Sequence, residues 1–195
     1  MGKIFYIMGK SSSGKDSIYR QLEENQELGL KRLVIYTTRP IREGEQNGVE
    51  YYFVDEEKLH EMEEKSQVIE ARSYHTRCGV WTYFTADDGQ IDLDGSDYLL
   101  IGTLVSYQAL RKYFGEKALV PVYLEVEDGL RLARALERER RQDQPKYAEM
   151  CRRFLADEKD FSEENLVESG ITRRFYNESL PECLDEIGAY IKEMR

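Results

Sequence analysis

Residues 9–17 read Gly9-Lys10-Ser11-Ser12-Ser13-Gly14-Lys15-Asp16-Ser17, and this stretch decides the fold. The apolar run from Ile4 to Met8 before it predicts a buried strand, and the apolar spacing after Lys15 predicts a helix to about Asn25. A Gly-x-x-x-x-Gly-Lys pattern between a strand and a helix predicts a phosphate-binding loop, because backbone N–H groups and the helix N-terminus attract phosphate oxygens. The alternative is a glycine- and serine-rich linker that matches the pattern by chance.

Within the loop, Lys15 is expected to reach the outer phosphates of a bound nucleotide as a compact positive charge. Asp16 stands where the pattern normally places a Ser or Thr that holds Mg²⁺. A carboxylate is also a good oxygen ligand for Mg²⁺, so we expect Asp16 and Ser17 to bind the metal; alternatively, Asp16 caps the helix. The residues expected to contact ATP here are Gly9, Ser11, Ser12, Ser13, Gly14, Lys15, Asp16 and Ser17.

The order of elements predicts an α/β fold with a parallel-sheet core. Short apolar runs predict further strands at 33–36, 98–101 and 119–124, while residues 104–113 predict a helix. Residues 37–90 differ in composition, being rich in Tyr, Gly and charged residues, and predict a small inserted α+β lobe. Residues 128–160 predict two helices with a break at Pro145. We therefore expect one domain with a core (1–36, 91–127 and 161–195), a lobe (37–90) and a helical lid (128–160).

A second motif, Thr37-Thr38-Arg39-Pro40-Ile41-Arg42, follows the strand predicted at 33–36. Two arginines three residues apart can clamp a phosphate dianion, because each guanidinium offers planar paired donors. Tyr51 can add a hydroxyl donor. The alternative is a surface loop with ordinary salt bridges.

Composition excludes several classes of function. The 195 residues carry 28 Lys and Arg against 38 Asp and Glu, a net charge of −10, which argues against general nucleic-acid binding. The cysteines Cys78, Cys151 and Cys183 are far apart and predict neither a zinc site nor a disulfide framework. No apolar run is long enough for a signal core or a membrane span, so we expect a cytoplasmic protein without membrane partners.

The segment from Thr37 to Phe53 resembles the acceptor-binding segment of guanylate kinases, T-T-R-x-x-R-x-G-E-x-x-G-x-x-Y-x-F. The resemblance implies ATP-dependent phosphorylation of a nucleoside monophosphate, GMP or dGMP, with Mg²⁺ as cofactor. It also implies that Arg39, Arg42 and Tyr51 hold the acceptor phosphate and that Glu45 supports the arginines. Weaker matches follow farther along the chain, at residues 68–71, 78–79 and 99–103. With these, the acceptor-binding residues are expected to be Thr38, Arg39, Arg42, Glu45, Tyr51, Glu70 and Thr103.

The sequence departs from the family pattern at several positions, including those that contact the base of the acceptor nucleotide. Glu70 falls where the family has a glutamate that accepts hydrogen bonds from guanine, whose N1–H and N2–H₂ groups are donors only. Cys78 replaces a phosphate-binding tyrosine, and Ile101 and Thr103 replace two aspartates, one near the metal and one at guanine. These losses leave the identity of the base open. They also motivate the hypothesis that Asp16 takes over the metal-organising role of the missing strand aspartate.

The predicted lid carries Arg131, Arg134, Arg138 and Arg141 along one helix face, with Arg152 and Arg153 after the break. Positive charge around the moving phosphoryl group is the main catalytic requirement of such a transfer. The resemblance to the family's lid favours Arg138 and Arg153 as ATP contacts, and it favours Asn177 near adenine. The catalytic residues are therefore expected to be Lys15, Arg39, Arg138 and Arg153. For any one arginine, the alternative is a solvated helix face laced with Glu–Arg pairs.

Two other functions remain open on these residues. One is a kinase for a different nucleotide or small-molecule acceptor, which the loss of the guanine-side aspartate motivates. The other is a guanylate-kinase-like module that binds a ligand or a protein without catalysis. Retention of both phosphate motifs, at Lys15 and at Arg39 and Arg42, argues against the module.

Overall fold

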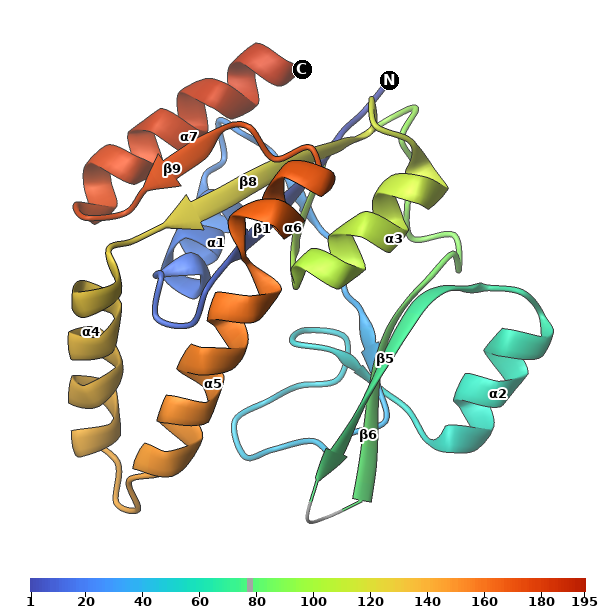
Figure 1. The fold of residues 1–195 in the computed structure, drawn as a ribbon. Helices are drawn as coiled ribbons and strands as arrows, with labels where there is room; N and C mark the ends of the chain where they lie inside the picture. The colour runs from blue at the N-terminus through green and yellow to red at the C-terminus, as the bar shows by residue number, and fades with distance from the viewer. Residues whose placement is uncertain (77–78) are drawn as a thin grey trace.

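A computed structural model describes residues 1–76 and 79–195 and has the predicted α/β architecture, with a parallel sheet and a second, smaller sheet (Figure 1). The parallel sheet has the strand order β2-β7-β1-β8-β9. Its strands are β1 (Ile4–Gly9), β2 (Lys31–Arg32), β7 (Tyr98–Ile101), β8 (Leu119–Glu125) and β9 (Arg174–Tyr176). Because all of them run parallel, their carboxyl ends meet at one edge of the sheet, where ligands bind in open α/β folds.

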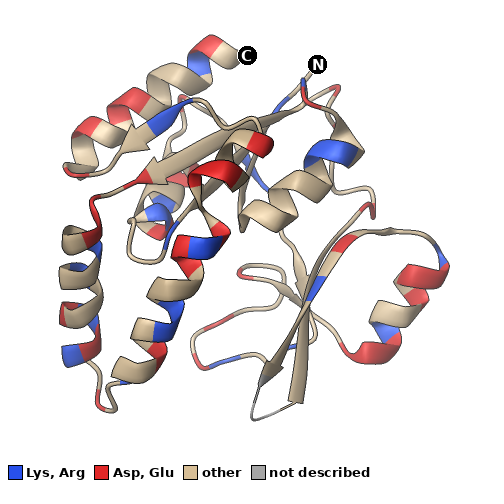
Figure 2. Cartoon of the chain, viewed as in Figure 1, with Lys and Arg blue, Asp and Glu red and all other residues tan. Residues whose placement is uncertain are grey.

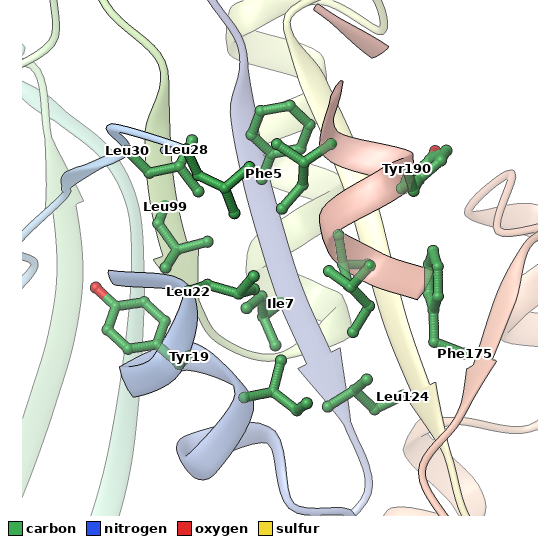
Figure 3. Close-up of a cluster of buried hydrophobic side chains, with 14 of the residues drawn as sticks. Phe5, Ile7, Tyr19, Leu22, Leu28, Leu30, Leu99, Leu124, Phe175 and Tyr190 are labelled. Carbon is green, nitrogen blue, oxygen red and sulfur yellow. The ribbon is translucent and has the colours of Figure 1, made fainter. Parts of the chain in front are cut away.

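Helices cover both faces of the parallel sheet, and the alternation of side chains along β1 explains why. Phe5 and Ile7 point to one face, against α1 (Lys15–Glu24) and α7 (Leu180–Met194) (Figure 3). Ile4, Tyr6 and Met8 point to the other face, against α3 (Leu104–Phe114) and α6 (Glu163–Glu168). With all five of these side chains inaccessible to solvent, β1 is the central strand that fixes the start of the phosphate-binding loop.

The second sheet has the order β4-β3-β6-β5 and lies below the parallel sheet in Figure 1. It consists of β3 (Tyr36–Thr37), β4 (Tyr52–Phe53), β5 (Val68–Thr76) and β6 (Gly79–Ala86), with α2 (Glu56–Glu64) packed beside it. Asp55 caps α2 as its position before the helix predicts, accepting from the Lys58 N–H at 2.8 Å.

One strand prediction was wrong. Residues 33–36 were expected to form a single strand, but the chain leaves the parallel sheet after Arg32 and joins the second sheet at Tyr36. Leu33 and Val34 are buried in this crossing, so their apolar character reflects burial between two sheets and not pairing in one.

The expected break in the lid region is present. Helices α4 (Asp128–Arg140) and α5 (Tyr147–Asp160) form a hairpin beside the parallel sheet (Figure 1). Both helices carry acidic and basic residues along their length (Figure 2). The short helix α6 was missed by the sequence analysis, although Ser162 is a recognisable cap that accepts from the Asn165 N–H at 3.3 Å.

In the described ranges, 1–76 and 79–195, none of the helices combines the length and the apolar character needed to cross a bilayer.

Candidate functional site

The loop between β1 and α1 has the backbone geometry of an anion-binding nest. Ser12 and Gly14 adopt positive φ angles of 63° and 86°, which turn successive N–H groups toward one side. Across residues 1–76 and 79–195, no protein acceptor pairs with the N–H groups of Ser12, Gly14, Lys15 and Asp16. The buried hydroxyls of Ser12 and Ser13 likewise lack a partner in that part of the chain. Unsatisfied donors gathered at a helix N-terminus are well suited to phosphate oxygens.

The loop is held from behind by Asn177, at the end of β9. The side-chain amide of Asn177 donates to the Ser13 carbonyl at 2.8 Å, and the backbone carbonyl of Asn177 accepts from Arg134 at 3.0 Å. A Cβ at Gly14 would lie 2.3 Å from the Asn177 amide nitrogen, so only glycine fits there. Asn177 is 3% exposed. It therefore supports the loop from the protein side, whereas the sequence analysis expected it to contact ATP.

An ion network around the buried side chain of Arg131 ties the loop to the lid helices. Arg131, 1% exposed, donates to Asp128 and to Glu158, both at 2.6 Å, and to the Ser11 carbonyl at 3.3 Å. Asp157 accepts from the Ser11 N–H at 2.7 Å. This network (Arg131, Asp128, Asp157 and Glu158) fixes the base of α4 and α5 against the loop.

Replacing the buried cation of this network should destabilise the fold. Arg131→Met should lower the free energy of unfolding by about 1–3 kcal/mol, because Asp128 and Glu158 lose their closest cation and keep only Lys10, at 4.0 and 2.8 Å. Urea unfolding followed by circular dichroism measures the difference. Arg140→Met, on the exposed side of the same helix, is the control and should change stability by less than about 0.5 kcal/mol. Equal effects of the two substitutions would contradict the role given to Arg131.

A first cleft, of about 330 Å³, opens in front of the loop. The residues that line it are Ser11, Ser12, Gly14, Lys15, Asp16, Ser17, Arg134, Arg138 and Arg153. Across the described residues, Lys15 and Arg138 make no side-chain hydrogen bond or ion pair, whereas Arg153 pairs with Glu149 at 3.0 Å. The structure thus brings the predicted lid arginines, Arg138 and Arg153, together with the loop lysine around one anion-sized space.

Asp16 and Ser17 lie in the first turn of α1, and both are exposed to solvent. Their carboxylate and hydroxyl oxygens line the first cleft beside Lys15. Hard oxygen donors at the rim of a phosphate site fit Mg²⁺, which usually takes one or two carboxylates plus substrate phosphates. Among the residues that the structure describes, no cluster of three or more His, Cys, Asp or Glu forms an all-protein metal site.

A second cleft, of about 900 Å³, lies between the parallel sheet, the second sheet and the lid. Its walls are formed by Lys15, Asp16, Ile35, Arg42, Tyr51, Arg72, Tyr74, His75, Trp81, Tyr83, Ile101, Gly102, Thr103, Glu149, Arg152 and Arg153. Tyr83 packs edge-on against Tyr51 and Tyr74, with ring centroids 5.5 and 5.8 Å apart. The cleft therefore combines an aromatic wall with five basic side chains, which suits a flat ring that carries an anion.

Arg39 does not line this cleft. It is 2% exposed, and its guanidinium donates to both oxygens of Glu45, at 2.8 and 3.0 Å. Glu45 also accepts from the Arg42 N–H at 2.8 Å. Arg39 and Glu45 therefore shape the loop that presents Arg42, whose guanidinium has no partner among the described residues. Thr38 belongs to the same support, accepting from the Thr82 N–H at 2.9 Å.

The Arg39–Glu45 pair gives the loop a predictable pH dependence. Hydrogen bonding from Arg39 holds the pKa of Glu45 below its usual value of 4.5. A lowered pKa in the folded state contributes stability above the unfolded pKa, and this contribution is lost as the pH falls through the folded value. The melting temperature of the wild type should therefore exceed that of Glu45→Gln by a constant margin above about pH 5.5, and the margin should shrink below about pH 4.5. A margin independent of pH would contradict this assignment.

Glu70 lies behind the second cleft and not in its wall. Its carboxylate, 5% exposed, accepts from Arg72 at 2.9 and 3.3 Å, from Thr85 at 2.8 Å and from Ser106 at 3.0 Å. Arg72 in turn donates to Thr103 at 3.0 Å. The sequence analysis expected Glu70 to meet the acceptor base and did not single out Arg72. The alternation along β5 could have identified it, since residues 70 and 72 share a face of the strand.

Thr103 and Cys78 are two further positions to which the sequence assigns a place at the site. Thr103 caps α3 and is held by Tyr6, whose hydroxyl donates to the Thr103 carbonyl at 2.9 Å. Cys78, expected in place of a phosphate-binding tyrosine, lies outside the described residues. Cys183 is a buried free thiol whose pKa burial raises to about 11, and Cys151 is an exposed free thiol.

These features define an α/β protein of the phosphate-loop class: a parallel sheet with the loop after its central strand, a second sheet and an arginine-bearing helical hairpin. Residues 1–83 match the family model "Guanylate kinase". Over these 83 residues the chain is similar to guanylate kinases.

Curated relatives match over part of their length. A guanylate kinase of Malacoplasma penetrans is 44% identical over 69 residues, 35% of either chain. Guanylate kinases of Vibrio vulnificus (34% identical, 45% of either chain) and Porphyromonas gingivalis (28% identical, 61% of this chain and 63% of the relative) also match. The matched segments thus span 35% to 63% of these relatives.

The fold match covers nearly the whole chain. The crystal structure of guanylate kinase from Anaplasma phagocytophilum superimposes with a TM-score of 0.67 over 98% of this chain and 85% of that one, at 20% identity. At this identity the superposition establishes the common fold alone.

Proposed function

We propose that the protein transfers the terminal phosphoryl group of ATP to a nucleoside monophosphate, with GMP or dGMP as the acceptor. The observation that carries the proposal is that the two clefts share Lys15, Asp16 and Arg153 in their walls. Two substrates bound in the two clefts would therefore meet at the same lysine. Guanylate kinase is also the name of every curated relative described above.

In this proposal the charged groups divide between the two substrates. The loop N–H groups and Lys15 bind the outer phosphates of ATP, and Arg42 with Tyr51 binds the acceptor phosphate. Arg138 and Arg153, from the two lid helices, surround the moving phosphoryl group with positive charge and exclude water. No general base is needed, because an oxygen of the acceptor phosphate is already nucleophilic at neutral pH.

Mg²⁺ belongs to the same proposal, with Asp16 and Ser17 as its protein ligands. The ion neutralises phosphate charge when it is bound. What supports the assignment is the exposed Asp16 carboxylate at the rim of the loop, together with the uncharged Ile101 and Thr103 at the end of β7.

Asp16→Ala should therefore raise the Mg²⁺ concentration needed for half-maximal rate by about tenfold or more, because a carboxylate ligand is lost. The affinity for ATP without metal should stay the same or rise, since a negative charge near the phosphates has gone. Asp16→Asn keeps the size of the side chain and is the matched variant. Unchanged Mg²⁺ titrations of the rate in both variants would remove Asp16 from the metal site.

ADP release from Mg-ATP with a panel of GMP, dGMP, AMP, CMP and UMP tests the function itself. Fast turnover with GMP or dGMP alone is the expected result. Turnover with another acceptor would keep the kinase and replace the base, and turnover with none would favour a module that binds without catalysis. This proposal also includes three expectations from the sequence. They are small-molecule nucleotides as partners, a cytoplasmic location, and closure of the lobes at 37–90 and 128–160 when the two substrates bind.

A further inference from the structure

One face of the β5–β6 hairpin forms part of the wall of the second cleft. Residues 70, 72 and 74 alternate onto this face of β5, and Arg72 stands opposite Tyr83 on β6. Glu70 is buried and outside the cleft wall, whereas Arg72 and Tyr83 are in the wall. Arg72 is therefore the innermost charged group on this face that a bound molecule can touch.

Arg72 is held firmly in place. Its Nε and one terminal nitrogen donate to the two oxygens of Glu70, at 2.9 and 3.3 Å, and its other terminal nitrogen donates to the Thr103 hydroxyl at 3.0 Å. Glu70 is itself fixed by Thr85 and Ser106, from two different elements. The guanidinium thus spans from β5 to the start of α3 with its plane set by both ends.

Arg72 has more N–H donors than its hydrogen bonds to Glu70 and Thr103 use. A guanidinium has five N–H groups, and three of them are used by Glu70 and Thr103. One N–H remains on each terminal nitrogen. Because Arg72 lines the cleft, these two donors are available to acceptors on a bound molecule.

Pairing with carboxylates distinguishes the cations that line the cleft. Arg72, 14% exposed, is neutralised by the buried Glu70 carboxylate, 5% exposed. Arg42 and Lys15, in the described part of the chain, have no carboxylate partner for their side chains. A dianionic phosphate is better matched by the unpaired cations, and the neutralised guanidinium is better matched by neutral acceptor atoms.

We infer that Arg72 is a specificity-determining residue that donates its two remaining N–H groups to O6 and N7 of guanine, an inference that rests on the proposed phosphorylation of GMP. Arginine donates to this pair of atoms in base recognition generally, because both are acceptors on one edge of the ring. Adenine presents an N6 amino donor in place of O6, so Arg72 and adenine would face each other donor to donor. Glu70 and Thr103 are the positioning residues for this contact.

The sharpest probe changes the nucleotide and leaves the protein intact. In 7-deaza-GMP a C–H group replaces N7, while the phosphate, the sugar, O6 and the N1–H and N2–H₂ donors stay. With the wild-type enzyme, kcat/KM should be about tenfold lower for 7-deaza-GMP than for GMP, the loss of one hydrogen bond to a charged donor. Values within twofold of each other would overturn the inference.

Substitutions then assign the preference to a residue. Arg72→Met should bring the ratio of kcat/KM for GMP and 7-deaza-GMP close to one. Arg42→Met, the same change at the phosphate end, should lower kcat/KM for both nucleotides and leave their ratio near ten. A ratio that survives in Arg72→Met would overturn the inference. Should that variant not fold, Arg72→Met combined with Glu70→Gln removes the buried carboxylate together with its cation and should lose the ratio in the same way.

The outcomes distinguish a failure of the proposed role of Arg72 from a failure of the proposed function. Absence of ADP release with every monophosphate contradicts the proposed function. In that case calorimetric affinities for GMP and 7-deaza-GMP still test Arg72, and equal affinities, or binding of neither, would overturn its role. Phosphorylation of both nucleotides with equal kcat/KM leaves the kinase standing and removes only Arg72.

Discussion

Replacing Lys15 by Met should reduce the rate of phosphoryl transfer on the order of 10³-fold while leaving the fold as stable as the wild type. Lys15 sits in both clefts, at the point where the two substrates would meet. Its ammonium makes no hydrogen bond or ion pair within residues 1–76 and 79–195, so its removal leaves no protein group unsatisfied. Its positive charge is instead available to the outer phosphates and to the charge that develops during transfer.

Single-turnover measurement of ADP formation, at saturating ATP and acceptor, gives the rate, and thermal unfolding gives the stability. Lys112→Met removes an exposed lysine of α3 that lines neither cleft and is the matched control, expected to leave the rate within twofold. A tenfold or smaller loss for Lys15→Met would show that the charge of the lysine is not used in the reaction. A large fall in melting temperature would show instead that Lys15 has a structural role.

The loop around Lys15 could be predicted because its signal is local. A strand, a Gly-x-x-x-x-Gly-Lys sequence and a helix follow one another within 24 residues, and each is determined by the residues it contains. The same holds for the cap at Asp55 and for the break between α4 and α5. In each case, neighbours in sequence are also the neighbours that decide the structure.

The structure departs from the expectations where partners distant in sequence decide the outcome. Residues 33–36 form an apolar run, and only the tertiary structure ends β2 before it and begins β3 at its last residue. Glu70 has the right charge for a base contact, but Arg72, Thr85 and Ser106 converge on it. Asn177 faces the Ser13 carbonyl because β9 pairs with β8, which pairs with β1. Contacts of this kind cannot be predicted from the local sequence pattern.

Pairing separates the arginines that carboxylates neutralise from those whose full charge is available to a phosphate. Arg39, Arg72 and Arg131 are each paired with carboxylates, and Arg39 and Arg131 are almost fully buried. A buried cation must be paired because its desolvation is otherwise too costly. In the described part of the chain, Arg42 and Arg138 have no carboxylate partner although they line a cleft. A cation left unpaired beside a cavity is the better candidate for binding a phosphate.

Arg138 therefore carries the second large expected effect. Arg138→Met should lower kcat on the order of 10²-fold with little change in the KM for GMP, because its guanidinium lines the cleft of the phosphate loop and not that of the acceptor. Lid arginines act on the charge of the moving phosphoryl group, so the loss should appear in the chemical step. Arg140→Met, two residues along the same helix and outside both clefts, controls for helix stability and net charge and should retain the wild-type kcat. Equal losses in the two variants would mean that the lid contributes only general positive charge. A loss confined to the KM for ATP would assign Arg138 to ground-state binding and leave Arg153 as the lid residue that acts on the transferred group.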